Sequence, residues 1–304
     1  MSAPYLLATT TQTAWLLDPA SGNARCVDAG RGVYYGITFT TETIFIACRQ
    51  APVGADRSTQ NNVILCFDHN LQPITELRAG WPIRDVHQIF HYEGTLYICS
   101  TFDDCIIEYS LRHKAWDRWF PFGDHGEAKD AHHINSIFVD KQGFLLAGTL
   151  PDGWFARFDS NKRPCGAGKY SLGVATHNVW RAGDDISVCS SNESSIVSKS
   201  GNIQKPYERG WLRGVARLGA CLFVGVSQNL VRDVRASSDC MIARLEADGS
   251  PSRVYAFRGM GMLHDIRTIN IPDETHNGMV FKWPGSISQH DPFVYSTYPH
   301  VIDL

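Results

Sequence analysis

The chain has 304 residues, 43% of them hydrophobic, and its 28 basic and 31 acidic side chains leave a formal net charge of −3. This length allows a large buried core, and the near-neutral balance argues against a general electrostatic attraction to nucleic acid or to an anionic membrane. Because no apolar run approaches the length of a membrane span and no basic flank precedes a long apolar segment near Met1, we expect neither a membrane anchor nor a signal peptide.

The chain begins with three short apolar runs, which are separated by turn residues and lie at residues 5–10, 13–18 and 24–28. A longer unit starts at residue 35 and consists of an apolar run, a tight turn, and a second apolar run that ends in a small residue. The unit then recurs, the last time as its first run alone, at residues 85–100, 133–148, 177–189, 213–225 and 263–269. Self-similarity at this spacing indicates an array of repeated structural units.

Each complete unit continues with a third run and a short outer run, as at residues 105–110 and 115–120. Runs of this length punctuated by glycine and asparagine are typical of β-strands, and no segment has a convincing helical periodicity. The start of the chain supplies the second to fourth strands of a unit whose first strand is residues 263–269. We therefore predict an all-β fold: a single β-propeller over residues 1–304 with six four-stranded blades, closed by pairing the N- and C-terminal strands. Five or seven blades are the alternatives.

Three segments fall outside the repeat, namely two long loops at residues 49–61 and 228–239 and a C-terminal extension at residues 272–304. Long loops in a compact array are more often functional or partner-facing than empty, so we consider these two loops as surfaces for a protein partner. The extension contains three histidines, which we expect to be exposed unless the extension folds back over the ring: His276, His290 and His300.

The nine cysteines are an odd number, are scattered, and include no Cys-x-x-Cys pair. Cys48, Cys99 and Cys189 occupy one position of the repeat, and the other copies carry Gly148 and Gly225 there. A position that alternates between cysteine and glycine requires a small side chain rather than a disulfide partner. We predict buried, reduced thiols in a cytoplasmic protein.

The first strand of each propeller blade lines the central channel, and aligning the six copies places one side chain per blade at the channel mouth. These residues are Tyr35, His87, Asn135, His177, Arg213 and His264. His133 lies two residues before Asn135 and would point the same way, one step further out, if the strand alternates regularly.

Three of these side chains are imidazoles on alternate blades, and three histidines with an open position are typical of a catalytic metal site. We predict a divalent transition metal (iron, zinc or copper) held by His87, His177 and His264, with His133 and Asn135 as auxiliary ligands. Arg213 would contact an anionic group of the substrate, and Tyr35 would donate a proton.

Three alternatives stay open. In the first, each channel histidine only hydrogen-bonds water and backbone. In the second, one of them acts as a metal-free base or nucleophile beside Arg213 in a transferase or lyase. In the third, the protein is a binding scaffold whose long loops hold a protein partner. A calcium-dependent propeller hydrolase is disfavoured, because the mouth has no aligned acidic side chains.

Several blade motifs resemble a poorly characterised group of bacterial propeller proteins that carry a domain of unknown function, DUF4915. The motifs are residues 208–227, His133-Ile-Asn-Ser-Ile137 and His177-Asn-Val-Trp180, and the resemblance covers about residues 80 to 270. It implies the propeller fold but no reaction. From the residues themselves we predict an enzyme that acts on a small polar or anionic molecule at the channel mouth, with neither nucleic acid nor membrane as a partner.

Overall fold

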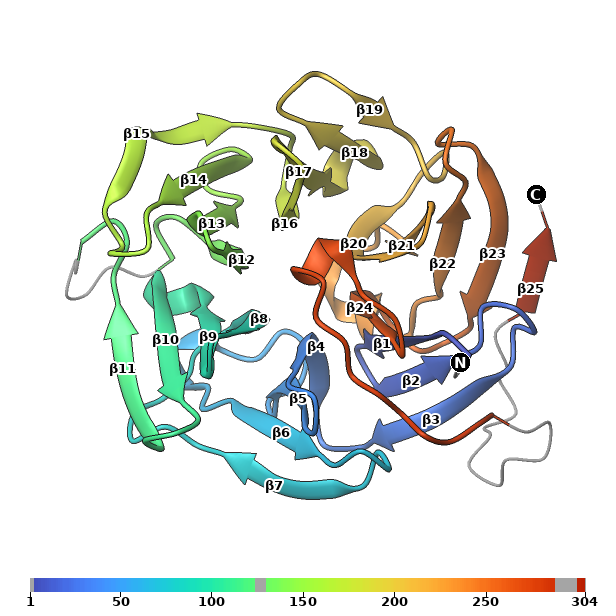
Figure 1. Cartoon of the computed structure of the whole chain (residues 1–304), viewed down its shortest axis with the longest axis horizontal. Helices are drawn as coiled ribbons and strands as arrows, with labels where there is room; N and C mark the ends of the chain where they lie inside the picture. Colours follow the sequence, from blue (N-terminus) through green and yellow to red (C-terminus); the bar gives the residue numbers. More distant parts are fainter. Residues whose placement is uncertain (1–2, 124–129, 288–299, 304) are drawn as a thin grey trace.

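The computed structural model describes residues 3–123, 130–287 and 300–303. Six antiparallel sheets surround a central axis in the order of the sequence, which confirms the predicted six-bladed β-propeller (Figure 1). The only helical elements among the described residues are short 3-10 turns, and no helix there is long and apolar enough to cross a membrane.

The innermost strands of the blades are β4 (Val33–Phe39), β8 (Val86–Tyr92), β12 (Ile134–Asp140), β16 (Thr176–Ala182), β20 (Trp211–Leu218) and β24 (Leu263–Ile269). The second strands are β5 (Ile44–Arg49), β9 (Thr95–Ser100), β13 (Gly143–Gly148), β17 (Asp185–Ser190), β21 (Cys221–Ser227) and β1 (Tyr5–Thr10). The third strands are β6 (Val63–Phe67), β10 (Cys105–Ser110), β14 (Trp154–Phe158), β18 (Ser195–Ser198), β22 (Cys240–Leu245) and β2 (Thr13–Leu17). The outer strands are β7 (Pro73–Leu77), β11 (Ala115–Trp119), β15 (Pro164–Ser171), β19 (Ile203–Gln204), β23 (Pro251–Phe257) and β3 (Ala24–Ala29).

The ring closes within a single blade, as predicted. Strand β1 pairs with β24 along its whole length, with Tyr5 opposite Ile269. A further strand, β25 (His300–Asp303), pairs with β23 and adds a fifth strand to the neighbouring blade. This pairing completes the last blade with strands from both ends of the described chain.

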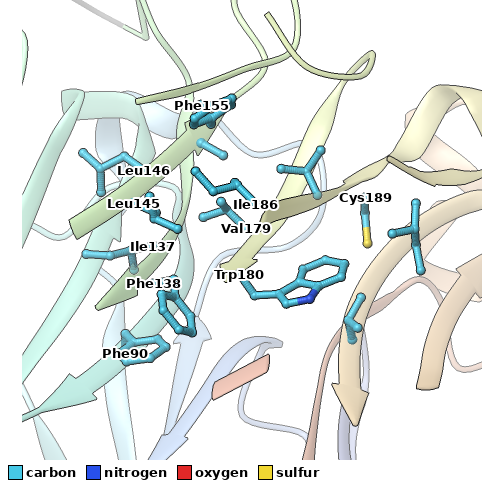
Figure 2. Packing of buried hydrophobic residues seen from close by; sticks show 14 of the residues in the cluster. Phe90, Ile137, Phe138, Leu145, Leu146, Phe155, Val179, Trp180, Ile186 and Cys189 are labelled. Carbon is cyan, nitrogen blue, oxygen red and sulfur yellow. The ribbon is translucent and has the colours of Figure 1, made fainter. Parts of the chain in front are cut away.

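The core lies between neighbouring blades, where the faces of successive sheets pack against each other. Figure 2 shows this packing for the blades of β12 and β16: Ile137 and Phe138 lie on one side and Val179 and Trp180 on the other. All four are nearly or fully buried. Burying each side chain of this size contributes about 1.5–3 kcal/mol, and the contact recurs at every blade interface.

The position predicted to need a small side chain is tightly enclosed. Cys48, Cys99 and Cys189 are fully buried there, and all nine cysteines of the chain are free thiols. A Cβ atom added at Gly148 would lie 2.6 Å from the carbonyl oxygen of His133, and one at Gly225 would overlap the carbonyl oxygen of Arg213. Small residues at this position therefore let each second strand approach the backbone of the mouth residues.

The segment after β24 folds back and fills one end of the channel, so the predicted exposure of His276 is wrong. The 3-10 turn η5 (Glu274–His276), orange-red near the centre of Figure 1, contacts β16 and β20. His276 is fully buried, its Nε2 lies 2.8 Å from Oγ1 of Thr38, and its ring packs on Phe39 and Phe90. Since Thr38 and Phe39 end β4, this turn closes the end of the channel at which the inner strands finish. His290 lies outside the described residues.

A positively charged pocket at the channel mouth

A pocket of about 210 Å³ lies at the other end of the channel, where the inner strands begin. It is lined by six of the seven residues that the sequence singles out: Tyr35, His87, His133, His177, Arg213 and His264. Residues from both long loops complete its wall, including Arg57 and Arg235. The alignment of the repeats therefore brings distant side chains to one place.

Asn135 is the seventh predicted residue, and it is not part of the wall of this pocket. Its Nδ2 donates to the carbonyl oxygen of Thr176 at 3.0 Å, and its Oδ1 accepts from Oγ of Ser136 at 2.6 Å. It lines a cavity of about 20 Å³ further down the channel, a volume that suits a single water molecule. Its side chain ties two blades together instead of reaching the mouth.

The regular alternation assumed for these strands does not hold at the mouth. Asp85, His133 and Ala175 each lie two residues before a channel residue, and each has a left-handed backbone, with φ of 48°, 52° and 52°. The ladders also shift register at the start of β8, β12 and β16. At Asp85 and Ala175 the left-handed backbone turns the carbonyl back toward a channel imidazole, a local geometry that apolar periodicity alone does not reveal.

These carbonyl groups fix the tautomers of two imidazoles. Nδ1 of His87 lies 3.0 Å from the carbonyl oxygen of Asp85, and Nδ1 of His177 lies 2.8 Å from that of Ala175. A carbonyl only accepts, so each Nδ1 carries the hydrogen. Hydroxyls of Thr101 and Ser191 also accept from these Nδ1 atoms, because each donates its own hydrogen to a backbone carbonyl of the next blade.

Both rings are neutral at physiological pH. Burial lowers the pKa of His87 to about 3, and burial together with the charge of Arg213 lowers the pKa of His177 well below its ordinary value. Neutral rings with a hydrogen on Nδ1 present Nε2 as a bare acceptor. Nε2 of His177 is buried and has no hydrogen-bond partner among the described residues. The pocket therefore contains at least one unused acceptor, Nε2 of His177.

His133 has the same tautomer, with its hydrogen on Nδ1, and here a carboxylate fixes it. Its Nδ1 lies 2.7 Å from Oδ1 of Asp130, which is itself paired with Arg57. A carboxylate that holds Nδ1–H leaves Nε2 as the basic atom, which is the arrangement of a general base oriented by an acid. The ring of His133 meets that of His87 edge-on, with 5.5 Å between ring centroids.

His264 has the opposite tautomer. Nη1 of Arg213 lies 3.2 Å from Nδ1 of His264, and since a guanidinium only donates, this Nδ1 carries no hydrogen. The neutral ring then has its hydrogen on Nε2, which faces Oγ1 of Thr11 at 3.4 Å. Burial and the charge of Arg213 hold the pKa of His264 well below its ordinary value. The ring supports Arg213 and offers the pocket no free lone pair.

Arg213 is a partly buried cation that forms no ion pair within 4 Å among the described residues. Burial lowers the pKa of its guanidinium to about 10, so it stays charged at neutral pH. Its recorded partners are His264 and the ring of Trp211, both neutral, and its Nε has no partner among the described residues. A desolvated charge of this kind is costly unless something compensates it.

Sequence reasoning missed the other charges around the pocket. Nη1 of Arg49 lies 3.3 Å and Nη1 of Arg57 lies 3.0 Å from the carboxylate of Asp85, and Arg57 reaches on to Asp130. Burial raises the pKa of Asp85, but His87, Arg57 and Arg49 outweigh burial and hold it below its ordinary value. Four arginines but one carboxylate line the pocket, so its wall carries excess positive charge. Arg57 and Arg235 come from loops that sequence analysis assigned to a protein partner. Counting the arginines in those loops is the signal that could have identified them.

The metal centre predicted from the sequence stays a prediction. Among the residues that the structure describes, no group of three or more histidine, cysteine or acidic side chains is placed to hold a metal ion. Arg213 occupies the lone pair of His264, and the excess of arginines disfavours a second cation. The predicted ligands His87, His133 and His177 do lie together, with 6.5 Å between the ring centroids of His87 and His177.

No protein-family model matches the chain, and no curated protein sequence matches it. Among solved structures, it resembles a chain of a nidogen/laminin complex, with a TM-score of 0.63 and 10% identity over 87% of this chain and 98% of that one. It also resembles a protein of unknown function from Bacteroides caccae, with a TM-score of 0.61 and 9% identity over 88% and 99% of the two chains. At these identities the resemblance establishes the six-bladed propeller fold and nothing about the chemistry of the pocket.

Proposed function

We propose that this protein binds a small anionic substrate at the channel mouth, with Arg213 as the anchor and the neighbouring histidines as the groups for acid–base chemistry. The observation that carries the proposal is the partly buried guanidinium of Arg213, which has a neutral hydrogen-bond partner, a buried Nε without a partner and no ion pair among the described residues. A carboxylate or another oxyanion would supply the missing counter-charge, and its geometry matches the donor fork of arginine.

The surrounding electrostatics support the same conclusion. Asp85 forms its ion pairs with Arg49 and Arg57, so it compensates the charge of Arg213 only from a distance. The turn η5 closes the far end of the channel, which makes the mouth a closed-ended pocket with the charge at its wall. Such a cleft concentrates the field and raises the local concentration of anions.

The chemistry that these residues favour is metal-free. His133, oriented by Asp130, is the strongest candidate for a general base, and the Tyr35 hydroxyl remains the candidate proton donor. The proposal thus keeps the predicted small-molecule enzyme and replaces its metal with a histidine–carboxylate pair. The resemblance to DUF4915 stays a prediction and adds no residue to this site.

Isothermal titration with acetate, malonate, sulfate and phosphate tests the proposal. We expect at least one of these anions to bind the native protein and to bind an Arg213→Gln variant about tenfold or more weakly, because a buried charge-assisted hydrogen bond is lost. An Arg163→Gln variant changes an exposed arginine on another loop and should bind like the native protein. Equal affinity of the native and Arg213→Gln proteins would contradict the proposal.

A protein-binding scaffold is the second candidate function, and one observation favours it. The loop between β21 and β22 exposes three apolar side chains: Leu230 at 36%, Val231 at 74% and Val234 at 45%. Exposed apolar clusters often mark interaction sites. Under this function, replacing Val231 and Val234 by serine abolishes partner binding, and Arg213→Gln leaves it unchanged. Under the pocket function, Arg213→Gln weakens anion binding, and the two serine substitutions leave it unchanged.

A further inference from the structure

We infer that the substrate is a hydroxylated carboxylate: an anion that presents a neutral hydroxyl to the bare Nε2 atoms of His177 and His87 while Arg213 holds its carboxylate. The inference rests on the proposed function and narrows it to one substrate class. It comes from the hydrogen bonds that fix the two rings, which define a second, uncharged recognition element beside the arginine.

The first step is the fixed tautomer. Nδ1 of His177 is 2.8 Å from the carbonyl oxygen of Ala175 and 2.8 Å from Oγ of Ser191, and that hydroxyl donates to the carbonyl oxygen of Leu212. Every group around Nδ1 is therefore an acceptor toward it. Reversing the ring would place an unprotonated nitrogen against a carbonyl, so Nε2 stays an acceptor.

The second step is that this acceptor is buried and unused. The His177 residue is 4% exposed, and its Nε2 has no partner among the described residues although the ring lines the pocket. A buried acceptor without a donor is costly, and a site built around such an atom rejects molecules that lack the donor. His87 has the same tautomer two blades away, because its Nδ1 is held by the carbonyl of Asp85 and the hydroxyl of Thr101.

The third step selects the kind of donor. Four arginines and one carboxylate line the pocket, so a ligand ammonium group would be repelled where a neutral hydroxyl is not. The volume of about 210 Å³ lies below the range of roughly 300–1,000 Å³ typical of sites for drug-sized ligands. A small hydroxy acid satisfies the charge, the donor and the size together.

Matched pairs of small acids test the inference in protein that has been treated with a chelator. The pairs are glycolate and acetate, lactate and propionate, and malate and succinate, each pair differing by a single hydroxyl. In isothermal titration we expect the hydroxy acid of at least one pair to bind about tenfold or more tightly than its partner. In a His177→Phe variant this preference should fall toward onefold while the affinity for the deoxy acid persists.

A His87→Phe variant repeats the measurement should His177→Phe fail to fold, and His69→Phe, at an exposed histidine, is the matched control that keeps the preference. Equal binding of both members of every pair to the native protein overturns the inference and leaves the anion-binding function standing. Binding of none of the six acids overturns the inference. If the simple anions in the panel above also fail to bind, the proposed function falls with it.

Discussion

Nη1 of Arg213 lies 3.2 Å from Nδ1 of His264, so a permanent cation is held by an imidazole that accepts its hydrogen bond only while neutral. The two residues lie on neighbouring inner strands, β20 and β24, and both line the pocket. The relationship turns a buried histidine, which the sequence presents as a metal ligand, into the positioning residue for an arginine.

Replacing His264 by leucine should destabilise the protein, because the partly buried guanidinium of Arg213 loses its acceptor. We expect the free energy of unfolding to fall by about 1–3 kcal/mol in urea denaturation. In the double variant His264→Leu/Arg213→Leu the loss should be smaller than the sum of the two single losses, with a coupling of about 0.5–3 kcal/mol. Strict additivity of the two changes would mean that the pair does not interact.

Substitution of Gly225 should displace the backbone of Arg213 and so disturb the pocket. A Cβ atom at this position would overlap the carbonyl oxygen of Arg213, so the backbone that carries the guanidinium must move. We expect Gly225→Ala to cost about 1–3 kcal/mol of stability and to weaken anion binding. Gly80→Ala, where nothing lies within 4 Å of the added atom, is the control and should change neither. Native-like anion affinity in Gly225→Ala would show that the site tolerates this shift.

Stability should fall on acidification below about pH 6.5. Burial lowers the pKa of His87 to about 3 and lowers the pKa of three further buried histidines, His177, His264 and His276. Below about pH 6.5 these histidines therefore bind protons in the unfolded chain but remain unprotonated in the folded state. The stabilisation is complete above pH 6.5 and is lost as the pH falls, with a slope of about 1.4 kcal/mol per pH unit for each histidine.

Urea denaturation at pH 7.5, 6.0 and 5.0 measures this loss, and His87→Phe should make the slope shallower. Asp265 acts in the opposite direction, because burial raises the pKa of its carboxyl to about 6 despite the neighbouring Arg267. Its contribution is complete below the ordinary value near 3.8 and declines as the pH rises through about 6. Asp28 and Asp273, whose pKa values burial also raises, act in the same direction as Asp265. Five histidines oppose these three carboxyls, because burial lowers the pKa of His91 as well, so stability that is flat or rising on acidification would contradict the prediction.

Elemental analysis of protein purified without a histidine tag tests the predicted metal. We expect far less than one equivalent of iron, zinc or copper, because no described group is placed to hold an ion and Arg213 occupies the lone pair of His264. A His177→Ala variant run in parallel gives the comparison. Near-stoichiometric metal that disappears in this variant would establish a metal site and return His87, His133 and His177 to the role of ligands.

The blade count and six of the seven site residues could be predicted because they depend on a repeat. Aligning the repeats on the apolar pair that follows each mouth residue needs only sequence spacing. It correctly predicted that Tyr35 and Arg213 line one pocket. The same alignment misplaced Asn135, because its amide hydrogen-bonds the carbonyl of Thr176 and the hydroxyl of Ser136 instead of facing the mouth. Left-handed residues such as Asp85 and His133 break the alternation, and nothing in an apolar pattern marks them.

The charges from the loops could not be predicted in the same way. Arg57 lies in a loop with no counterpart in the other blades, so no repeat fixes its position, and its contact with Asp130 joins residues 73 positions apart. The burial of His276 depends on how the segment after the last inner strand folds back, which is a tertiary event. The local apolar pattern of the sequence determines the blades, whereas the chemistry of the channel mouth depends on the positions of the irregular segments in the folded protein.

The closure of the ring also sets the order in which the pocket can form during synthesis. Strand β1 is synthesised before the other strands of the propeller, yet its partner β24 is made after more than two hundred further residues. Until then Arg213 exists without His264, and Tyr35 lacks the ring that packs 4.2 Å from it. Pairing over so long a separation is slow and leaves apolar surface uncovered, so a nascent chain of this protein is expected to need protection until its last blade closes.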